Sequence, residues 1–501
     1  MLPSIIASSL AIKAVLMRCY HSTDFEVHRN WMAIVYNLPP SEWYFNSVSM
    51  WTLDYPPFFA YFEWLLAHIA VHVDPTIVTL SATPVLNDNV LLFQRCSVVI
   101  TEFVLLWATW RFAYRNKKDT INQKETVFTL VALNSGLILV DHIHFQYNGL
   151  LLGLLVLCFD AASREQGVLV AVYFSILVLS KHLFLTLAPV FAAYLWQSYC
   201  TDWGRRKGHT FTLTVVVRFA LLVAIALIAL FLCFGPVLLW DNSSGPLEVV
   251  LPELKRRAFQ IVSRLFPFGR GLVHSYWAPN VWALYYFTDR VANAVLGRMN
   301  LLSKVARGKR VGSASSTVSG LVGGVSPTVL PDATAPICMA LVFLFSLPAL
   351  YRIFTAPKRD RNVSLLVKAV VYTSLTAFML GYHVHEKAIL VPLVAQTFLL
   401  LPSGHAPDAF SLYTELAAAG TAALLPLFTS TTERWIKVVV FATFLALVMR
   451  FNNSQRRTNV SVFVVAATGY MVVLTELFYP YLVIQKGVPQ LAAFAQRYQF
   501  L

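Results

Sequence analysis

The feature that most constrains this chain is a series of long apolar runs spread over nearly its whole length. Of its 501 residues, 57% are hydrophobic and 13% are charged, and the mean hydropathy is +0.62. Soluble domains are nearer half apolar and a quarter charged. Because the runs are long and do not alternate as barrel strands do, we expect a polytopic membrane protein. Lipid forces each spanning backbone to satisfy its own hydrogen bonds, so the spans should be helices.

We predict an all-α fold with about 13 transmembrane helices, several of them shorter than the roughly 20 residues that a bilayer normally requires. Residues 1–19 have the length of a signal peptide, but Lys13 interrupts the apolar core and no clean cleavage site follows, so we favour a retained first span. The candidate spans are residues 2–19, 90–113, 126–141, 149–162, 168–180, 183–200, 211–235, 333–354, 363–381, 388–401, 413–428, 434–450 and 460–480.

The net charge of +14 comes from basic residues in short turns between the apolar runs. This is the positive-inside pattern of a membrane protein, so we assign these turns to the cytosol and expect no nucleic-acid partner. We read residues 1–501 as one membrane-embedded domain, with a first lumenal loop at 20–89 and a second large lumenal or re-entrant region at 236–332. An even number of crossings in 271–332 keeps the charge rule intact. The basic turns are 115–118, 204–208, 357–361 and 454–457.

The stretch TDFEVHRNW, which starts at residue 23, predicts an amphipathic helix in the first lumenal loop. Thr23 and Glu26 fit the S/T-x-x-E capping box, and the double proline at 39–40 should end the helix. Asp24, His28 and Arg29 lie off its apolar stripe, so we expect the helix to lie on the membrane surface. The stripe consists of Val27, Trp31, Ile34, Val35 and Leu38.

A second interfacial helix should follow Asp54, because Tyr55-Pro56-Pro57 places prolines where helices often open. Each of the two helices therefore begins beside an aspartate, Asp24 or Asp54. The helix dipole favours the charged form of a carboxylate at this position. Carboxylates are common at helix starts, so spacing alone leaves a purely structural role open for both.

Further polar clusters stand at the edges of apolar runs, in VDHIHFQYNG (140–149), SKH (180–182) and GYHVHEKAIL (381–390). Ionisable groups at such depth are costly and usually functional, although polar turns that simply meet water are the alternative. Two His-x-His pairs supply adjacent imidazoles, but a metal site needs three or four ligands, so we expect no metal. The basic segment 254–271 suits anionic lipid headgroups, a pyrophosphate or plain surface packing.

Five motifs in one order carry a resemblance to a known family: TDFEVHRNW, TLDYPPFFAYFE, DHIHFQYNG, SRLFPFGRG and GYHVHEKAIL. The series resembles the endoplasmic-reticulum glucosyltransferases that use dolichyl phosphate glucose to complete the lipid-linked oligosaccharide. It covers most of residues 21–400. The enzyme adding the first glucose tends to read DFEAQRHW, DHGHFQYN and FPFARGLFEDKVANFW. The variants DFEVHRNW, DHIHFQYNG and FPFGRGLVHSYWAPNVW are closer to the branch that adds the second glucose in α-1,3 linkage.

The resemblance implies a GT-C-type fold and an inverting, metal-independent transfer without any cofactor, in the ER membrane with the active site facing the lumen. The donor would be dolichyl phosphate β-glucose, the acceptor a dolichyl-diphosphate oligosaccharide, and ER lipids would surround the chain. Asp24 would be the general base, and Asp54 would also be required. Expected substrate contacts are Glu26, His28, Arg29, His142, His144, Gln146, Arg270, His383, His385, Glu386 and Lys387.

Within that set, His383, His385 and Lys387 are candidates for the donor phosphate, with Arg270 as a further choice and Glu386 as an orienting group. Three alternatives stay open: the first-glucose enzyme of the same family, a lipid or sugar transporter, and a non-catalytic assembly subunit. The topology also predicts N-glycosylation at one of four N-x-S/T sites. Of Asn242, Asn362, Asn452 and Asn459, only Asn242 falls in a loop assigned to the lumen.

Overall fold

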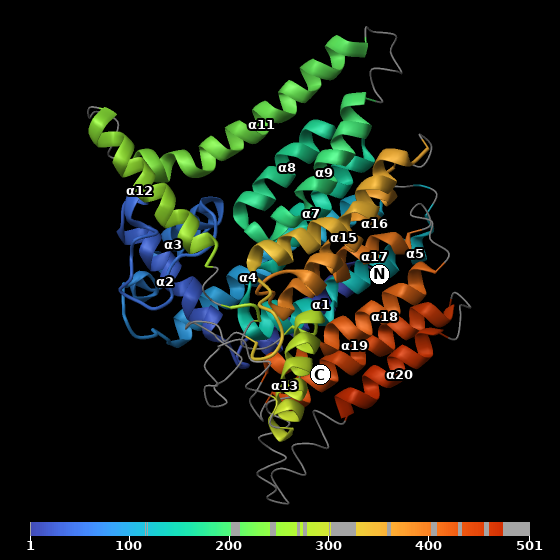
Figure 1. Ribbon diagram of the computed structural model, residues 1–501. Helices are drawn as coiled ribbons and strands as arrows, with labels where there is room; N and C mark the ends of the chain where they lie inside the picture. The colour runs from blue at the N-terminus through green and yellow to red at the C-terminus, as the bar shows by residue number, and fades with distance from the viewer. Residues whose placement is uncertain are drawn as a thin grey trace, which may run out of the picture. The chain divides into compact units, whose positions relative to one another are not determined.

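The computed structural model (Figure 1) consists of helices and connecting loops. Within the part of the chain that it describes there is no strand, only an isolated parallel bridge between Val273 and Val384. The all-α prediction is confirmed for these residues. The described residues are 2–115, 117, 119–201, 211–240, 247–267, 271–273, 278–299, 301, 327–357, 362–401, 408–428, 433–454 and 460–473.

Eight helical segments among the described residues are long and apolar enough to cross a membrane. Each corresponds to one of the predicted spans, so a multi-pass membrane protein is confirmed, whereas the number of about 13 stays a prediction. Three further predicted spans are shorter apolar helices: α1 (Leu2–Leu16), α7 (Asn148–Ser163) and α8 (Gly167–Ser180). The eight segments are Asp88–Ala113, Ile121–Phe145, His182–Thr201, Leu213–Leu239, Ala335–Thr355, Val363–Leu380, Ala409–Leu427 and Arg434–Asn452.

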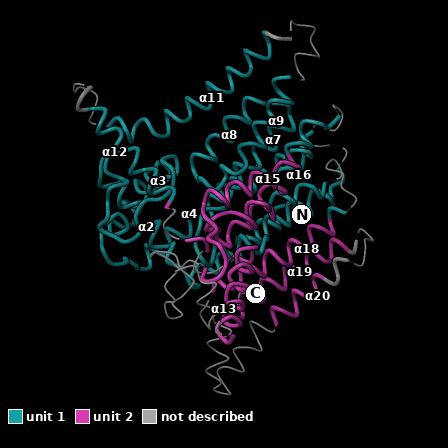
Figure 2. Tube along the Cα trace, in the orientation of Figure 1, with its two compact units in different colours: residues 1–266, 350–370, 394–409 teal, residues 267–349, 371–393, 410–501 magenta. Residues whose placement is uncertain are grey.

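The chain divides into two compact units, which Figure 2 colours separately. Unit 1 comprises residues 1–266, 350–370 and 394–409, and unit 2 comprises residues 267–349, 371–393 and 410–501. Unit 1 contains α1, α7 and α8 together with α2 (Thr23–Asn37), α3 (Pro57–Val73), α4 (Asp88–Ala113), α5 (Ile121–Ala132), the π-helix η3 (Ile138–Phe145), η4 (His182–Leu187), α9 (Ala188–Leu195), α11 (Phe211–Leu239) and α12 (Leu247–Leu265).

Two glycines let α7 pack closely against α4 in unit 1. A Cβ atom on Gly153 would lie 2.8 Å from the backbone nitrogen of Leu105, and one on Gly149 would lie 2.9 Å from Cγ of Glu102. Small residues four positions apart are a common way for membrane helices to approach each other. This contact brings the start of α7 beside the middle of α4.

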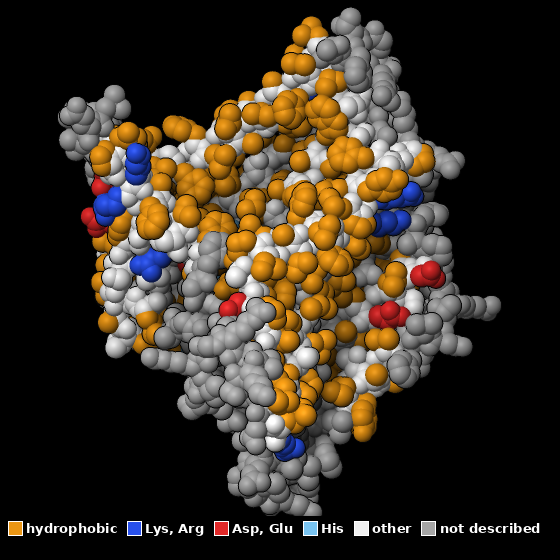
Figure 3. All heavy atoms as spheres, viewed as in Figure 1, with side chains coloured by type: hydrophobic (Ala, Val, Ile, Leu, Met, Phe, Trp, Pro, Cys, Tyr) orange, Lys and Arg blue, Asp and Glu red, His pale blue; other side chains and the backbone are white. Residues whose placement is uncertain are grey.

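Helix α11 presents apolar side chains outward along its length, as Figure 3 shows on one face of the molecule. Leu227 and Phe231 are 60% and 64% exposed. A helix of this composition is stable with such exposure when lipid surrounds it. Helix α12 follows and packs on the first loop of unit 1: Gln260 donates to the carbonyl oxygen of Tyr44 at 2.9 Å.

Unit 2 holds the chain around the second predicted lumenal region. Its bridge at Val273 and Val384 joins the residues after the FPFGRG motif to the HVHEK motif. The described part of 271–332 contains one helix, α13, and no candidate span, so the even number of crossings stays a prediction. The other helices that lie in or enter unit 2 are α15 (Ala335–Thr355), α16 (Val363–Leu380), α17 (Leu390–Thr397), α18 (Ala409–Ala422), α19 (Arg434–Ser454) and α20 (Val460–Val472), while α13 spans Val281–Arg298.

The first predicted interfacial helix, α2, starts at Thr23 as expected and ends at Asn37, two residues before the double proline. Its cap differs from the prediction. Ser22, not Thr23, caps the helix, and Glu26 pairs with Arg29 rather than reaching back to the cap. α3, η2 (Pro75–Val78) and η3 pack around α2 and leave His28 and Arg29 1% and 0% exposed, while the position of this helix at the membrane surface stays a prediction.

Candidate functional site

Asp24 lies in the first turn of α2, where the Ser22 hydroxyl accepts the Asp24 backbone N–H at 3.1 Å. Gln146 Nε2 donates to Asp24 Oδ2 at 2.6 Å, and His144 Nε2 lies 3.2 Å from the same oxygen. The side chain of Asp24 is 22% exposed, whereas that of His144 is 6% exposed. The structure therefore brings three predicted site residues together and leaves the carboxylate partly accessible.

The segment that carries His144 and Gln146 is itself fixed to the start of α2. Ser22 donates to the carbonyl oxygen of His144 twice, from its backbone nitrogen at 2.9 Å and from its hydroxyl at 2.7 Å. His144 belongs to the π-helix η3 and Gln146 directly follows it; the last residue of η3, Phe145, has a φ of 88°. π-Helices and left-handed non-glycine residues both concentrate at functional sites, where the surrounding structure holds them in place.

Asp54 and Tyr55 stand just before α3, which begins at Pro57 as predicted. Burial raises the pKa of Tyr55, and the negative charges of Asp54 and then Asp24 raise it further. Both aspartates therefore lie within electrostatic range of one phenol, although they are 30 residues apart in the sequence. Asp54 and Tyr55 are both partly exposed. The negative charges of both predicted catalytic aspartates thus act on Tyr55.

Lys181 reaches the same tyrosine from the end of α8. Its Nζ lies 5.1 Å from the centroid of the Tyr55 ring and 3.3 Å from Oδ1 of Asn148. The Asn148 amide is oriented by Asp141, whose carboxylate accepts Asn148 Nδ2 at 2.8 Å and the Gly149 backbone N–H at 2.7 Å. Lys181 is partly exposed, whereas Asp141 is buried. We call Asp24, Asp54, Tyr55 and Lys181 the accessible polar wall.

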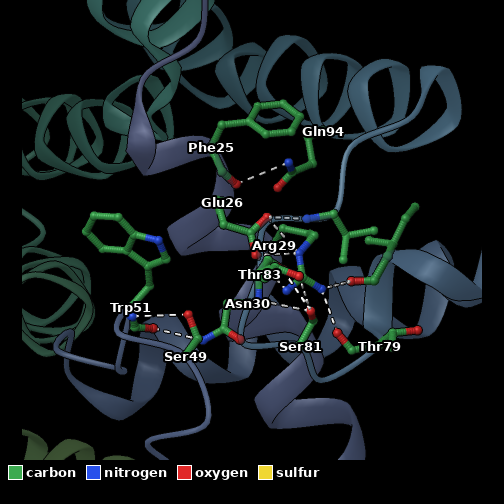
Figure 4. A network of polar contacts seen from close by, with 12 residues as sticks. Phe25, Glu26, Arg29, Asn30, Ser49, Trp51, Thr79, Ser81, Thr83 and Gln94 are labelled. Carbon is green, nitrogen blue, oxygen red and sulfur yellow. Dashed lines mark hydrogen bonds and ion pairs between the residues drawn. The ribbon is translucent and has the colours of Figure 1, made fainter.

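Glu26 and Arg29 face each other on α2 and form an ion pair that Figure 4 shows at its centre. Arg29 Nε lies 2.9 Å from both carboxylate oxygens of Glu26. Its Nη1 donates to the carbonyl oxygens of Ile77 and Thr79 at 3.1 and 2.8 Å. The guanidinium therefore ties α2 to the η2 segment. A contact of Glu26 or Arg29 with substrate stays a prediction.

His28 is enclosed by aromatic rings and paired with Glu63 of α3. The distance from His28 Nδ1 to Glu63 Oε1 is 2.6 Å, and Glu63 is fully buried. Burial raises the pKa of Glu63, and the hydrogen bond and charge of His28 offset this only in part. This pair joins α2 to α3, and a substrate contact for His28 stays a prediction. The rings around His28 are those of Trp31, Tyr55, Phe59, Phe145 and Tyr147.

His142 belongs to a buried charged group that joins three helices. Glu102 Oε2 lies 2.7 Å from His142 Nε2 and 2.5 Å from Lys13 Nζ. Arg95 lies on the same helix as Glu102 and donates to four backbone carbonyl oxygens, of which two belong to His142 and Ile143. The other two, Cys19 and Tyr20, precede α2. These contacts fix η3 and the approach to α2; a contact of His142 with substrate stays a prediction.

We call these three groups together the buried polar network. Its residues are Lys13, Glu26, His28, Arg29, Glu63, Arg95, Glu102 and His142. Sequence reasoning missed Glu63, Arg95 and Glu102, and it identified Lys181 only as a polar residue beside an apolar run. Lone charges inside apolar helices, as at Glu102 and Arg95, are the signal that marks such residues.

The HVHEK motif is described within unit 2. His383 donates from its backbone nitrogen to the carbonyl oxygen of Leu272 at 2.8 Å, and its Nδ1 lies 2.9 Å from that of Gly271. His383 has a φ of 53°, and its ring centroid lies 6.0 Å from that of His385. Glu386 is buried, whereas His383, His385 and Lys387 are partly exposed. The motif therefore packs on the end of the FPFGRG motif; Arg270 and Asn242 lie outside the described residues.

No cluster of three or more His, Cys, Asp or Glu side chains in the described ranges is arranged to hold a metal ion. The polar groups that the structure does assemble are pairs and triads of carboxylates with basic or amide side chains. Chemically, the accessible polar wall can take up a proton at a carboxylate and can hold an anion at an ammonium group.

Comparison with known proteins shows what this chain is similar to. Residues 9–501 match the family described as the ALG6, ALG8 glycosyltransferase family. A Drosophila melanogaster protein named probable dolichyl pyrophosphate Glc1Man9GlcNAc2 alpha-1,3-glucosyltransferase is 40% identical over 425 residues, which cover 84% of this chain and 75% of that protein.

Two further relatives carry the same name without the word probable. The Neurospora crassa protein is 35% identical over 507 residues, which cover 100% of this chain and 94% of the relative. The Mus musculus protein is 36% identical over 451 residues, which cover 87% of this chain and 80% of the relative. The similarity therefore extends through both compact units.

Proposed function

This chain belongs to the ALG6, ALG8 glycosyltransferase family, and we propose that it transfers glucose to a dolichol-linked oligosaccharide. The acceptor is the monoglucosylated glycan named in its relatives, Glc1Man9GlcNAc2, and the new linkage is α-1,3. The donor is dolichyl phosphate β-glucose, and the reaction takes place at the lumenal side of the ER membrane. The chain is thus an enzyme that adds the second glucose of the N-glycan precursor.

The chemistry is a single displacement with inversion at the glucose C1. The acceptor hydroxyl oxygen attacks C1 and forms the new glycosidic bond, while the bond from C1 to the phosphate oxygen breaks. The hydroxyl proton passes to the base, and the electron pair of the broken bond leaves with dolichyl phosphate. A sugar hydroxyl is a poor nucleophile, so a carboxylate in hydrogen-bonding reach of it accelerates this step.

The observation that supports this mechanism is the partial exposure and the orientation of the Asp24 carboxylate. Its carboxylate is partly exposed, and Gln146 and His144 approach one of its oxygens, so the group is oriented without being enclosed. Asp24 also begins a helix, where the dipole favours the ionised form that a base requires. Asp54 belongs to the same wall, and its charge acts on Tyr55. It assists in positioning the substrates.

Binding to two lipid-linked substrates also fits the way the chain is built. The donor's polyprenyl tail stays in the bilayer while its headgroup meets a polar wall at the ends of apolar helices, which confines and orients both reactants. The departing phosphate requires cations or hydrogen-bond donors to stabilise its charge. His383, His385 and Lys387 of unit 2 stay candidates for this role, as does Arg270.

The test is turnover by the purified full chain with two acceptors, one unglucosylated and one carrying a single glucose. We expect dolichyl phosphate glucose to be consumed only with the monoglucosylated acceptor, and a product whose new bond is α-1,3. Turnover of the unglucosylated acceptor alone would assign the chain to the first-glucose reaction instead. Product formation in detergent, where no compartments exist, separates an enzyme from a transporter.

A further inference from the structure

A phosphate-ester donor would bring negative charge to the accessible polar wall, which already carries carboxylates. Asp24 and Asp54 are partly exposed, and both add negative charge at the phenol of Tyr55, so an anionic headgroup at this wall would meet two carboxylates. Two like charges about 4 Å apart near a protein surface repel each other by about 4 kcal/mol, at an effective dielectric constant of about 20. A cation on this wall would offset that repulsion.

The arginines that the structure describes nearby are engaged in contacts within the protein. Arg29 is 0% exposed and binds Glu26 and two carbonyl oxygens. Arg95 is 2% exposed and binds four carbonyl oxygens. Arg264 of α12 donates to the carbonyl oxygen of Tyr44 and to the hydroxyl of Thr52 at 3.3 and 3.1 Å. Each of them holds the fold around the wall rather than standing on it.

Lys181 differs from these arginines in position and setting. Its ammonium lies 5.1 Å from the centroid of the Tyr55 ring, on the tyrosine that links Asp24 and Asp54 electrostatically. The side chain is partly exposed, and its contact with Asn148 is long, at 3.3 Å. The buried Asp141 fixes the Asn148 amide, so the lysine is aimed by a rigid support. A lysine binds phosphate as a compact point charge with three N–H donors.

We propose that Lys181 contacts the phosphate of the lipid-linked donor and stabilises the dolichyl phosphate that leaves, from its place over the ring of Tyr55. This assignment rests on the proposed function and adds to it a phosphate-binding residue in unit 1. As C1 leaves the phosphate oxygen, negative charge grows there, and the ammonium stabilises it more strongly than it stabilises the ester.

The test measures affinity for the leaving group separately from turnover. Full-length Lys181→Gln, Lys181→Met and Lys181→Arg variants in lipid nanodiscs are compared for the Kd of dolichyl phosphate and of dolichol, which lacks the phosphate. We expect the Gln and Met variants to bind dolichyl phosphate about tenfold or more weakly, with dolichol binding unchanged. They should also lose about 10²–10³-fold in kcat/KM for the donor, with the acceptor KM retained, as for removal of a single charge-stabilising donor.

Arg at this position keeps the charge, so Lys181→Arg should recover most of the affinity for dolichyl phosphate. Lys117→Gln is the matched control, because it removes an exposed lysine charge from the turn 115–118, which the charge pattern assigns to the cytosol. Affinity of Lys181→Gln for dolichyl phosphate within about twofold of the parent chain would overturn the proposal. Equal loss of dolichyl phosphate and dolichol binding would also overturn it, since that marks a structural role alone.

The two hypotheses fail in different ways. If the chain uses an acceptor other than the monoglucosylated one, the proposed function is wrong, but the Kd values for dolichyl phosphate still report on Lys181. If turnover of the monoglucosylated acceptor is as proposed and these Kd values do not change, only the assignment of Lys181 is wrong.

Discussion

Helix α2 carries similar residues in two very different settings. Asp24, at its start, is partly exposed and belongs to the accessible polar wall, whereas Glu26, His28 and Arg29, within the next turn and a half, are buried and paired inside the protein. All four look alike as polar residues of one motif. The comparison teaches that partner and exposure, not residue type, separate a group available for chemistry from one that holds the fold.

The same contrast holds between the wall and the buried polar network as a whole. In the network each charged group faces an opposite charge or several carbonyl oxygens, as Glu102 does with Lys13 and His142. Removing one member of a buried pair leaves the other charge buried without a partner, which lowers the free energy of unfolding. On the wall, the carboxylate of Asp24 and the ammonium of Lys181 are partly exposed, so a substrate can reach them. Substitutions in the two regions should therefore fail in different ways.

The largest effect is expected from Asp24→Asn. The amide keeps the size of the carboxylate but cannot accept the acceptor's proton, so kcat should fall by about 10²–10⁴-fold, the usual contribution of a general base. Expression, thermal stability and donor binding should stay near those of the parent chain. Steady-state turnover with the monoglucosylated acceptor measures the loss.

Asp88→Asn is the matched control for this variant, because Asp88 also lies in the first turn of a helix but is exposed there. Its turnover should match that of the parent chain. Near-normal turnover in the Asp24→Asn variant would refute the assignment of Asp24 as the base.

Arg29→Met should destabilise the fold rather than slow the chemistry. It leaves the carboxylate of Glu26 and the carbonyl oxygens of Ile77 and Thr79 without the guanidinium, so we expect a loss of about 3–5 kcal/mol in the free energy of unfolding, as for other broken buried pairs. Thermal unfolding in detergent measures this change. The residual folded fraction should retain its kcat.

Arg256 on α12 offers a close control, since it also pairs with a glutamate three residues earlier, Glu253, but at the surface. Exposed pairs of this kind contribute little, so Arg256→Met should leave the unfolding temperature almost unchanged. Equal destabilisation by the two substitutions would contradict the distinction between buried and exposed pairs on which the comparison depends.

A smaller effect is expected in the pH dependence of stability. The folded pKa of Glu63 lies above its ordinary value of 4.5, so the folded state holds this proton to higher pH than the unfolded state does. Stability therefore falls as pH rises from that value through the raised folded pKa. Glu63→Gln removes this titration and should flatten the dependence. Unfolding temperatures measured across this range check it.

The exposed Glu42 provides the control for Glu63. Glu42→Gln should leave the pH dependence of the unfolding temperature as it is in the parent chain. If the unfolding temperature of Glu63→Gln changes with pH as steeply as those of Glu42→Gln and the parent chain, the buried pair with His28 does not contribute the expected titration.

The smallest effect is expected from chelators. The proposed displacement uses a carboxylate as base and leaves no step to a metal, so turnover should persist in excess chelator. Steady-state assays before and after prolonged dialysis against chelator test this. A loss of turnover that added divalent cations restore would contradict the metal-independent reaction.

Much of the fold could be predicted because its causes are local. Long apolar runs predict spans, and the prolines before α3 predict where that helix begins. The predicted capping box at Thr23 does not form. The Ser22 side chain caps the helix instead, and Glu26 pairs with Arg29. A local pattern thus predicts that a helix starts, whereas the choice of partner depends on what the fold brings close.

The site could be predicted only as a set of candidates for the same reason. Gln146 meets Asp24 across 122 residues of chain, and Glu63 meets His28 across 35. No spacing rule links such positions. The position of Lys181 could not be predicted for the same reason. Its place beside Tyr55 depends on the packing of α8 against α3, which hydropathy does not specify.

The most direct test of the central claim is a structure of the full chain with a non-transferable analogue of dolichyl phosphate glucose bound. We expect the glucose to lie against the carboxylate of Asp24, with the face of C1 opposite the phosphate open to the acceptor. A donor sugar bound away from Asp24, or an Asp24 that faces the cytosol, would contradict the account.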